Sequence, residues 1–110
     1  MPFHTVARVG QLADGDIVAV SVDGTPMVLY RMGDEYLAAQ RECLHQGYDL
    51  ADGLVMGGFL ICPLHGWRYH ARTGVHEHTS QVCLRTYAVR VVGDDIQIDP
   101  TPMWKGELPR

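Results

Sequence analysis

The stretches 43-CLH-45 and 62-CPLHG-66 decide how this sequence is interpreted. Each stretch offers one thiol and one imidazole, with the cysteine first. Thiolates are soft ligands that suit iron–sulfur clusters and zinc, and imidazole suits iron and zinc. Two short segments with the same pair of ligand types therefore predict a single metal site. The candidate ligands are Cys43, His45, Cys62 and His65.

A structural zinc site is the first alternative, because zinc also binds two cysteines and two histidines. Zinc fingers usually place a cysteine pair before a histidine pair, whereas this chain interleaves the two residue types. The order therefore favours an iron–sulfur site. Pro63 and Gly66 flank the second ligand pair. Proline fixes φ and glycine permits positive φ, so both suit a tight loop that brings backbone amides close to metal-bound sulfur.

The whole chain has 110 residues, of which 46% are apolar and 20% are charged. This length predicts one domain, 1–110, and is too short for a two-domain enzyme. The net charge of −4 and the lack of a basic patch argue against nucleic-acid binding. No apolar run approaches the roughly 20 residues of a membrane helix, and no signal peptide is visible. We therefore expect a cytoplasmic protein that does not bind membranes.

Short apolar runs separated by glycine and aspartate predict an all-β, antiparallel sandwich or small barrel. Asp23-Gly24 predicts a hairpin turn, and residues 9–13 suggest one helical turn. Residues 1–40 and 81–110 are expected to form the base sheets, and residues 41–80 a smaller inserted lobe that carries both ligand pairs. The predicted strands cover residues 3–9, 16–22, 26–32, 35–40, 59–61, 86–92 and 95–99.

The pattern Cys-x-His…Cys-Pro-x-His-Gly resembles the cluster motif of Rieske-type [2Fe–2S] ferredoxins, which serve bacterial multicomponent oxygenases. The resemblance continues through most of the chain, at Gly47, Leu50, Gly53, Trp67, Tyr69, Thr73-Gly74, Leu84, Tyr87, Val89 and 93-GDDI-96. It implies a Rieske-type fold and one [2Fe–2S] cluster. In that arrangement Cys43 and Cys62 bind one iron, and His45 and His65 bind the other.

A cluster whose irons are fully ligated by protein has no open position for substrate, so the resemblance implies one-electron transfer and no catalysis. The expected partners, both transient, are an NADH-dependent flavoprotein reductase and a terminal oxygenase. That oxygenase would be an aromatic dioxygenase or a diiron monooxygenase of aromatic or alkene substrates. We expect a monomer. The alternatives are a Rieske small subunit of an assimilatory nitrite reductase and a zinc-stabilised binding module.

The resemblance also predicts the surroundings of the cluster. The two ligand histidines are expected at the surface, within a docking rim formed by Gln46, Gly47, Leu64 and Trp67, with Gly66 and Tyr69 close by. The ring of Tyr69 is expected to pack beneath the loops, and a hydroxyl contact with a ligand sulfur is the alternative. Trp67 stands where high-potential relatives place a serine donor. We therefore expect a reduction potential of roughly −150 mV, at the low end of the Rieske range.

Three other features complete the expectations. Cys83 lies between Val82 and Leu84, which is typical of a buried, inert thiol. His76 and His78 are expected to be exposed loop residues. The segment 100–110 contains three prolines and is expected to be extended, with Trp104 either packed on the sheet or part of a disordered tail.

Overall fold

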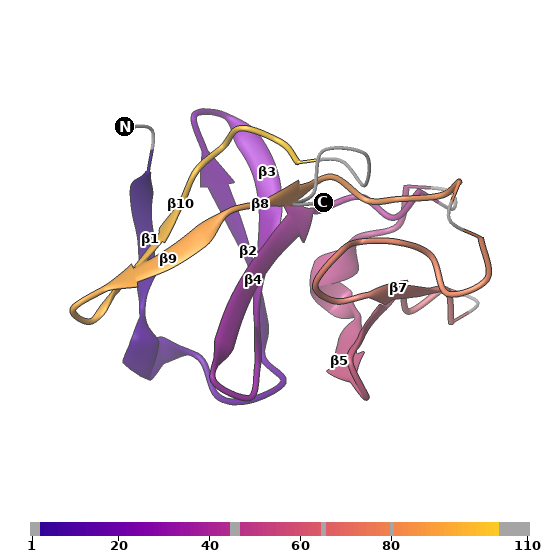
Figure 1. Cartoon of the computed structure of the whole chain (residues 1–110), viewed down its shortest axis with the longest axis horizontal. Helices are drawn as coiled ribbons and strands as arrows, with labels where there is room; N and C mark the ends of the chain where they lie inside the picture. Colours follow the sequence, from indigo (N-terminus) through magenta and orange to yellow (C-terminus); the bar gives the residue numbers. More distant parts are fainter. Residues whose placement is uncertain (1–2, 45–46, 65, 80, 104–110) are drawn as a thin grey trace.

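The computed structural model of the chain describes residues 3–44, 47–64, 66–79 and 81–103. Within these ranges three antiparallel sheets form, with strand orders β1-β10-β9, β2-β3-β4-β8 and β5-β6-β7 (Figure 1). The prediction of an all-β, antiparallel fold is confirmed. The elements are β1 (His4–Arg8), η1 (Val9–Gln11, a 3-10 turn), β2 (Ile17–Val22), β3 (Thr25–Met32), β4 (Glu35–Gln40), η2 (Leu50–Asp52, a second 3-10 turn), β5 (Leu54–Met56), β6 (Phe59–Ile61), β7 (Arg68–His70), β8 (Thr86–Tyr87), β9 (Val89–Val92) and β10 (Asp95–Ile98).

The β2–β3 hairpin shows why the glycine and aspartate turns predicted strands correctly. Val22 pairs with Thr25, which leaves Asp23-Gly24 as a two-residue turn. Both turn residues have positive φ, 51° and 78°. Such a turn matches the right-handed twist of the flanking strands, and aspartate and glycine are among the few residues that adopt it readily. The single helical turn expected near residue 9 is also present, as η1.

The expected single strand over residues 86–92 is in fact two strands in different sheets. β8 pairs with β4, where Ala39 faces Thr86, while β9 pairs with β10. Ala88 separates them, and its carbonyl accepts the amide of Asp99 at 3.0 Å. The chain therefore passes from one base sheet to the other without a turn, which a local apolar pattern does not reveal. The short strands β5 and β7 were also missed.

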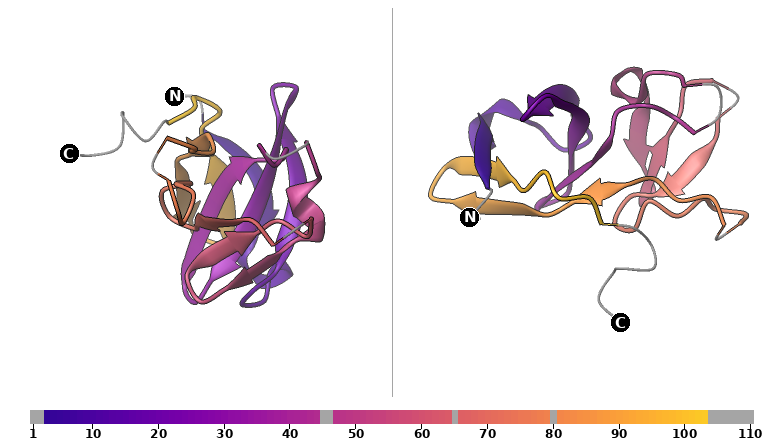
Figure 2. Two further views of the ribbon diagram at one scale, coloured as in Figure 1. Left: turned by 90° about the vertical axis from the view of Figure 1, so that its right-hand side faces the viewer. Right: turned by 90° about the horizontal axis from the view of Figure 1, so that it is seen from above.

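β3 is the central strand of the molecule and is buried on both faces. Met27 and Leu29 point into a core between the two base sheets, while Val28 and Tyr30 point into a second core. The second core lies against the third sheet, which is placed at one end of the base (Figures 1 and 2). The first core contains Leu12, Val22, Met27, Leu29, Ala38, Tyr87, Ile96 and Ile98. The second contains Val28, Tyr30, Ala39, Cys43, Leu50, Leu60, Cys62, Tyr69, Ala71 and Leu84.

Tyr30 joins the base to the third sheet by a buried hydrogen bond. Its hydroxyl donates to the carbonyl of Ala71, with 2.6 Å between the oxygens. Burial raises the pKa of this phenol far above its usual value, so it remains a neutral donor. Because a buried hydroxyl without a partner is costly, this bond fixes the distance between the two parts.

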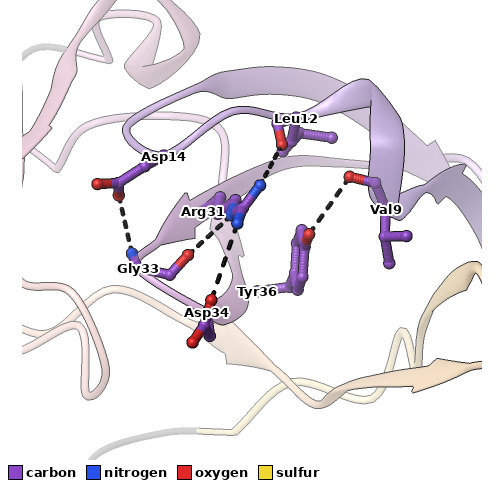
Figure 3. Close-up of polar contacts among 7 residues, drawn as sticks. All are labelled: Val9, Leu12, Asp14, Arg31, Gly33, Asp34 and Tyr36. Carbon is purple, nitrogen blue, oxygen red and sulfur yellow. Dashed lines mark hydrogen bonds and ion pairs between the residues drawn. The ribbon is translucent and has the colours of Figure 1, made fainter.

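Arg31 fastens the end of the base at the β3–β4 turn (Figure 3). Its guanidinium donates to the carbonyl of Leu12 at 2.8 Å and to that of Gly33 at 2.7 Å. The amide of Gly33 in turn donates to the carboxylate of Asp14 at 2.8 Å. These bonds tie the β3–β4 turn to the connection between η1 and β2, so the base presents a fixed frame to the third sheet.

Candidate metal centre

Two loops carry the predicted ligands, and each begins with a buried cysteine. The first loop, residues 43–49, lies between β4 and η2, and the second loop, residues 62–67, joins β6 to β7. Cys43 is 2% exposed and Cys62 is 0% exposed. The first loop is thus held between a strand and a 3-10 turn and the second between two strands, which suits a site that must hold its ligands in one geometry.

The two loops share a backbone hydrogen bond and a glycine of positive φ at the same spacing. The amide of Cys43 donates to the carbonyl of Tyr48 at 2.8 Å, and the amide of Cys62 donates to the carbonyl of Trp67 at 2.7 Å. One residue before each of these acceptors lies a glycine of positive φ, Gly47 at 67° and Gly66 at 68°. A side chain at either glycine would strain the turn. The structure thus gives a physical reason for both glycines of the motif.

An ion pair closes the base of the first loop. The guanidinium of Arg41 donates twice to the carboxylate of Asp49, at 3.0 and 2.8 Å. The same carboxylate accepts the amide of Ala51 at 2.9 Å and so caps η2. The hydrogen bond from Arg41 is the main cause that holds the pKa of Asp49 below its usual value.

We expect Asp49→Ala to lower the free energy of unfolding by about 1 to 2 kcal/mol, since it removes a cap and a partly exposed ion pair. Because the pKa of Asp49 is lowered in the folded protein, its contribution is complete above the unfolded value near 4. The contribution is lost as pH falls through the lower folded value. Urea titrations at pH 7 and pH 3 measure both effects. The control is Asp34→Ala, whose exposed carboxylate lies 3.9 Å from Arg31. Equal stability of the two variants at pH 7 would contradict the prediction.

The two cysteine thiols lie together in the second core. A hydrogen bond between them, together with the larger effect of burial, raises the pKa of Cys62 to about 11. The Cys62 thiol is therefore protonated at neutral pH, and it becomes a soft thiolate ligand when a metal displaces the proton. Within the described ranges no three His, Cys, Asp or Glu side chains are placed so that they could together hold a metal ion. The predicted ligands His45 and His65, and also Gln46, lie outside the described residues.

Tyr69 contacts the site through its hydroxyl, so the expectation that its ring only packs was wrong. The ring is fully buried, and its oxygen lies 3.2 Å from Sγ of Cys43. Burial raises the pKa of Tyr69 strongly, and the hydrogen bond with Cys43 raises it further. The hydroxyl therefore remains protonated and is able to donate to a metal-bound thiolate.

We expect Tyr69→Phe to lower the reduction potential of the loaded protein. The reduced centre carries more negative charge. A hydrogen bond from the Tyr69 hydroxyl to its sulfur therefore stabilises the reduced form more than the oxidised form. A difference of about 1 kcal/mol corresponds to roughly 40 mV for one electron. Potentiometric titration followed by EPR measures the shift, with Tyr36→Phe in the base as the control. An unchanged or higher potential would contradict the prediction.

The other residues predicted around the cluster differ in exposure. Gly47 and Gly66 are exposed, while Leu64 and Trp67 are half-buried. Two exposed apolar residues of the first loop were not assigned to the rim, Leu44 at 48% exposure and Tyr48 at 44%. Large apolar side chains in a short exposed loop were the sequence signal that could have identified them.

Two expectations away from the ligands need correction. His76 is buried, at 9% exposure, because its ring packs against aromatic side chains, whereas His78 is exposed as expected. Cys83 is half-buried and not fully buried, and its thiol lies 3.4 Å from the carbonyl of Leu84.

The described part of the C-terminal segment runs beside β8. Met103 and Thr86 exchange two backbone hydrogen bonds, of 2.7 and 3.0 Å. Trp104, whose position was left open, lies outside the described residues. Among the described residues, none of the helices has the length and apolar character needed to cross a membrane.

The sequence of this chain is similar to those of known proteins. Residues 3–88 match the family described as the Rieske [2Fe-2S] domain. The ferredoxin component of the naphthalene 1,2-dioxygenase system of Pseudomonas aeruginosa is 30% identical over 81% of this chain and 86% of its own length. The ferredoxin component of the alkene monooxygenase system of Xanthobacter autotrophicus is 29% identical over 91% and 83%.

The fold of this chain is also similar to that of a solved structure. A chain from the complex of reduced oxygenase and oxidized ferredoxin in carbazole 1,9a-dioxygenase matches this chain with a TM-score of 0.84 and 25% identity. The match covers 93% of this chain and 96% of that one. These similarities agree with the site, where two buried thiols lie together and each belongs to one of two loops. This chain belongs to the Rieske [2Fe-2S] domain family, and its cofactor is a Rieske-type [2Fe–2S] cluster in place of structural zinc.

Proposed function

We propose that this chain is a ferredoxin that carries single electrons from an NADH-dependent flavoprotein reductase to a terminal oxygenase acting on aromatic or alkene substrates. The observation that carries the proposal is the adjacent pair of buried thiols, Cys43 and Cys62, whose backbone amides each donate to the carbonyl five residues later. The relatives named as ferredoxin components of dioxygenase and monooxygenase systems support the class of partner.

The proposed ligands are Cys43 and Cys62 on one iron and His45 and His65 on the other. The cluster, when bound, supplies reversible one-electron transfer. The backbone bonds from Cys43 to Tyr48 and from Cys62 to Trp67 fix the thiolates, so little rearrangement accompanies a change of charge. Low rearrangement keeps the barrier to electron transfer small. In this proposal the protein acts as a carrier of electrons.

Docking is proposed to be brief and to involve the face that carries the first loop. Leu44 and Tyr48 supply exposed apolar contact area there, beside the flat backbone of Gly47. A small apolar patch suits an encounter that must form and dissociate in each cycle. We further propose that the protein is a monomer and that residues 1–40 and 81–110 form its base, with residues 41–80 as the cluster-binding lobe.

EPR spectroscopy with metal analysis tests the proposal. We expect two irons and two sulfides per chain, and a rhombic signal with average g below 2 that appears on reduction with dithionite. A protein that contains zinc and no iron would refute the electron-carrier function. Size-exclusion chromatography of the native protein tests the remaining alternative, a small subunit of a nitrite reductase. Such a subunit would elute with its large subunit, whereas a free electron carrier would elute alone.

A further inference from the structure

His76 lies in a segment that runs beside β7. The carbonyl of Val75 accepts the amide of His70 at 2.7 Å, and the amide of Glu77 donates to the carbonyl of Arg68 at 3.0 Å. Tyr69 and His76 are therefore directly opposite each other in an antiparallel bridge. The amide of His76 donates in turn to the carbonyl of Val82 at 2.9 Å. The backbone of His76 is thus held on both sides.

The imidazole of His76 packs inward against two aromatic rings. Its centroid lies 4.6 Å from that of Trp67 and 5.7 Å from that of Tyr69, with edge-to-face angles of 69° and 83°. These are the arrangements that aromatic rings prefer. Nδ1 accepts the backbone amide of His78 at 3.1 Å, which fixes the orientation of the ring.

The two residues whose rings His76 contacts each form a hydrogen bond with a different cysteine. Trp67 accepts the amide of Cys62 through its carbonyl, and Tyr69 places its hydroxyl 3.2 Å from Sγ of Cys43. One imidazole therefore contacts two residues that each hydrogen-bond a different cysteine of the metal centre. A hydroxyl–sulfur contact weakens steeply with distance and angle, so it depends on what holds the tyrosine ring in place.

We propose that His76 is a positioning residue that tunes the reduction potential of the cluster by holding Tyr69 against Cys43. The proposal rests on the proposed function, because it requires the cluster to be bound between the two loops. The ring of His76 acts through its shape and its fixed orientation. Removal of that ring leaves space into which Tyr69 tilts, and the hydroxyl then moves away from the sulfur.

The test is potentiometric titration, followed by EPR, of the loaded protein and its variants. We expect His76→Ala to shift the midpoint potential downward, in the direction that Tyr69→Phe shifts it. His76→Phe retains an aromatic ring and is expected to stay near the wild-type potential. The matched control is His70→Ala. His70 neighbours Tyr69 in β7 but is exposed and stacks on Phe59 with 4.9 Å between centroids, so its removal should leave the potential unchanged.

The double variant distinguishes positioning from a general loss of structure. In a Tyr69→Phe background His76→Ala should shift the potential much less than in the wild type, since the hydroxyl is already absent. An equal shift in both backgrounds, or an unchanged potential in fully iron-loaded His76→Ala, would overturn the proposal. If His76→Ala fails to hold iron, His76→Phe and His76→Asn decide, because only the ring-bearing variant should keep the wild-type potential. A wild-type protein without a cluster would instead refute the proposed function.

Discussion

Cys62→Ser yields a folded protein that carries no [2Fe–2S] cluster. Serine keeps the shape of the side chain but offers a hard, protonated hydroxyl in place of a soft thiolate. The site is fully buried, so no other side chain can enter to take the vacated position. We expect the iron content to fall from two per chain to near zero and the visible absorption to disappear, while far-UV circular dichroism keeps its β signature.

The matched control for this experiment is Cys83→Ser. Cys83 is the third cysteine of the chain, and its thiol contacts backbone carbonyls of Thr73 and Leu84. This variant should retain full iron and the wild-type spectrum. A Cys62→Ser protein that still held two irons with an unchanged EPR spectrum would contradict the ligand assignment, and so would loss of the cluster in Cys83→Ser alone.

Gly53→Ala is expected to cause the largest loss of stability from a single added methyl group. A Cβ at Gly53 would lie 2.1 Å from the carbonyl oxygen of Ile61 and 3.2 Å from that of Leu50. Both contacts are with backbone, so no side chain can rotate away. Ile61 pairs with Leu54 in β5–β6, and the next residue along is Cys62. The clash therefore acts on the strand that leads directly to a ligand.

We expect this substitution to lower the free energy of unfolding by about 3 kcal/mol, at the upper end of the range for overpacked sites. That amount is a large share of the 5 to 15 kcal/mol typical of a domain. Urea denaturation of the wild type and the variant measures it. Gly10→Ala is the matched control, because nothing lies within 4 Å of its added Cβ, and it should be neutral or slightly stabilising. Equal midpoints for both variants would contradict the expectation.

Local chemistry explains which parts of the fold the sequence predicted well. The Asp23-Gly24 turn and the apolar run of β3 depend on residues next to one another, so both strands and their hairpin were correctly placed. The cysteines were identified for the same reason, since ligand type and spacing are visible in the sequence. β5 and β7 were missed because only the middle residue of each three-residue strand points inward, which is too little pattern to indicate a strand. β6 has the same length but its apolar run Phe59–Ile61 marked it.

The burial of His76 and the hydroxyl contact of Tyr69 depend on packing between distant segments. Nothing in the segment around His76 shows that Trp67 and Tyr69 will cover its ring, because those rings come from the far side of a turn. The sequence around Tyr69 is also the same whether its ring only packs beneath the loops or its hydroxyl contacts a sulfur. Only the three-dimensional arrangement separates these cases.

The double-sided burial of β3 means that the two halves of this molecule share one folding unit. Alternate residues of a single strand fill the core of the base and the core that contains the cysteines, so neither core can assemble while the other is open. We therefore expect the two cores to unfold in one cooperative event. The colour of the bound cluster becomes an optical reporter of the entire structure, including strands that lie far from any iron.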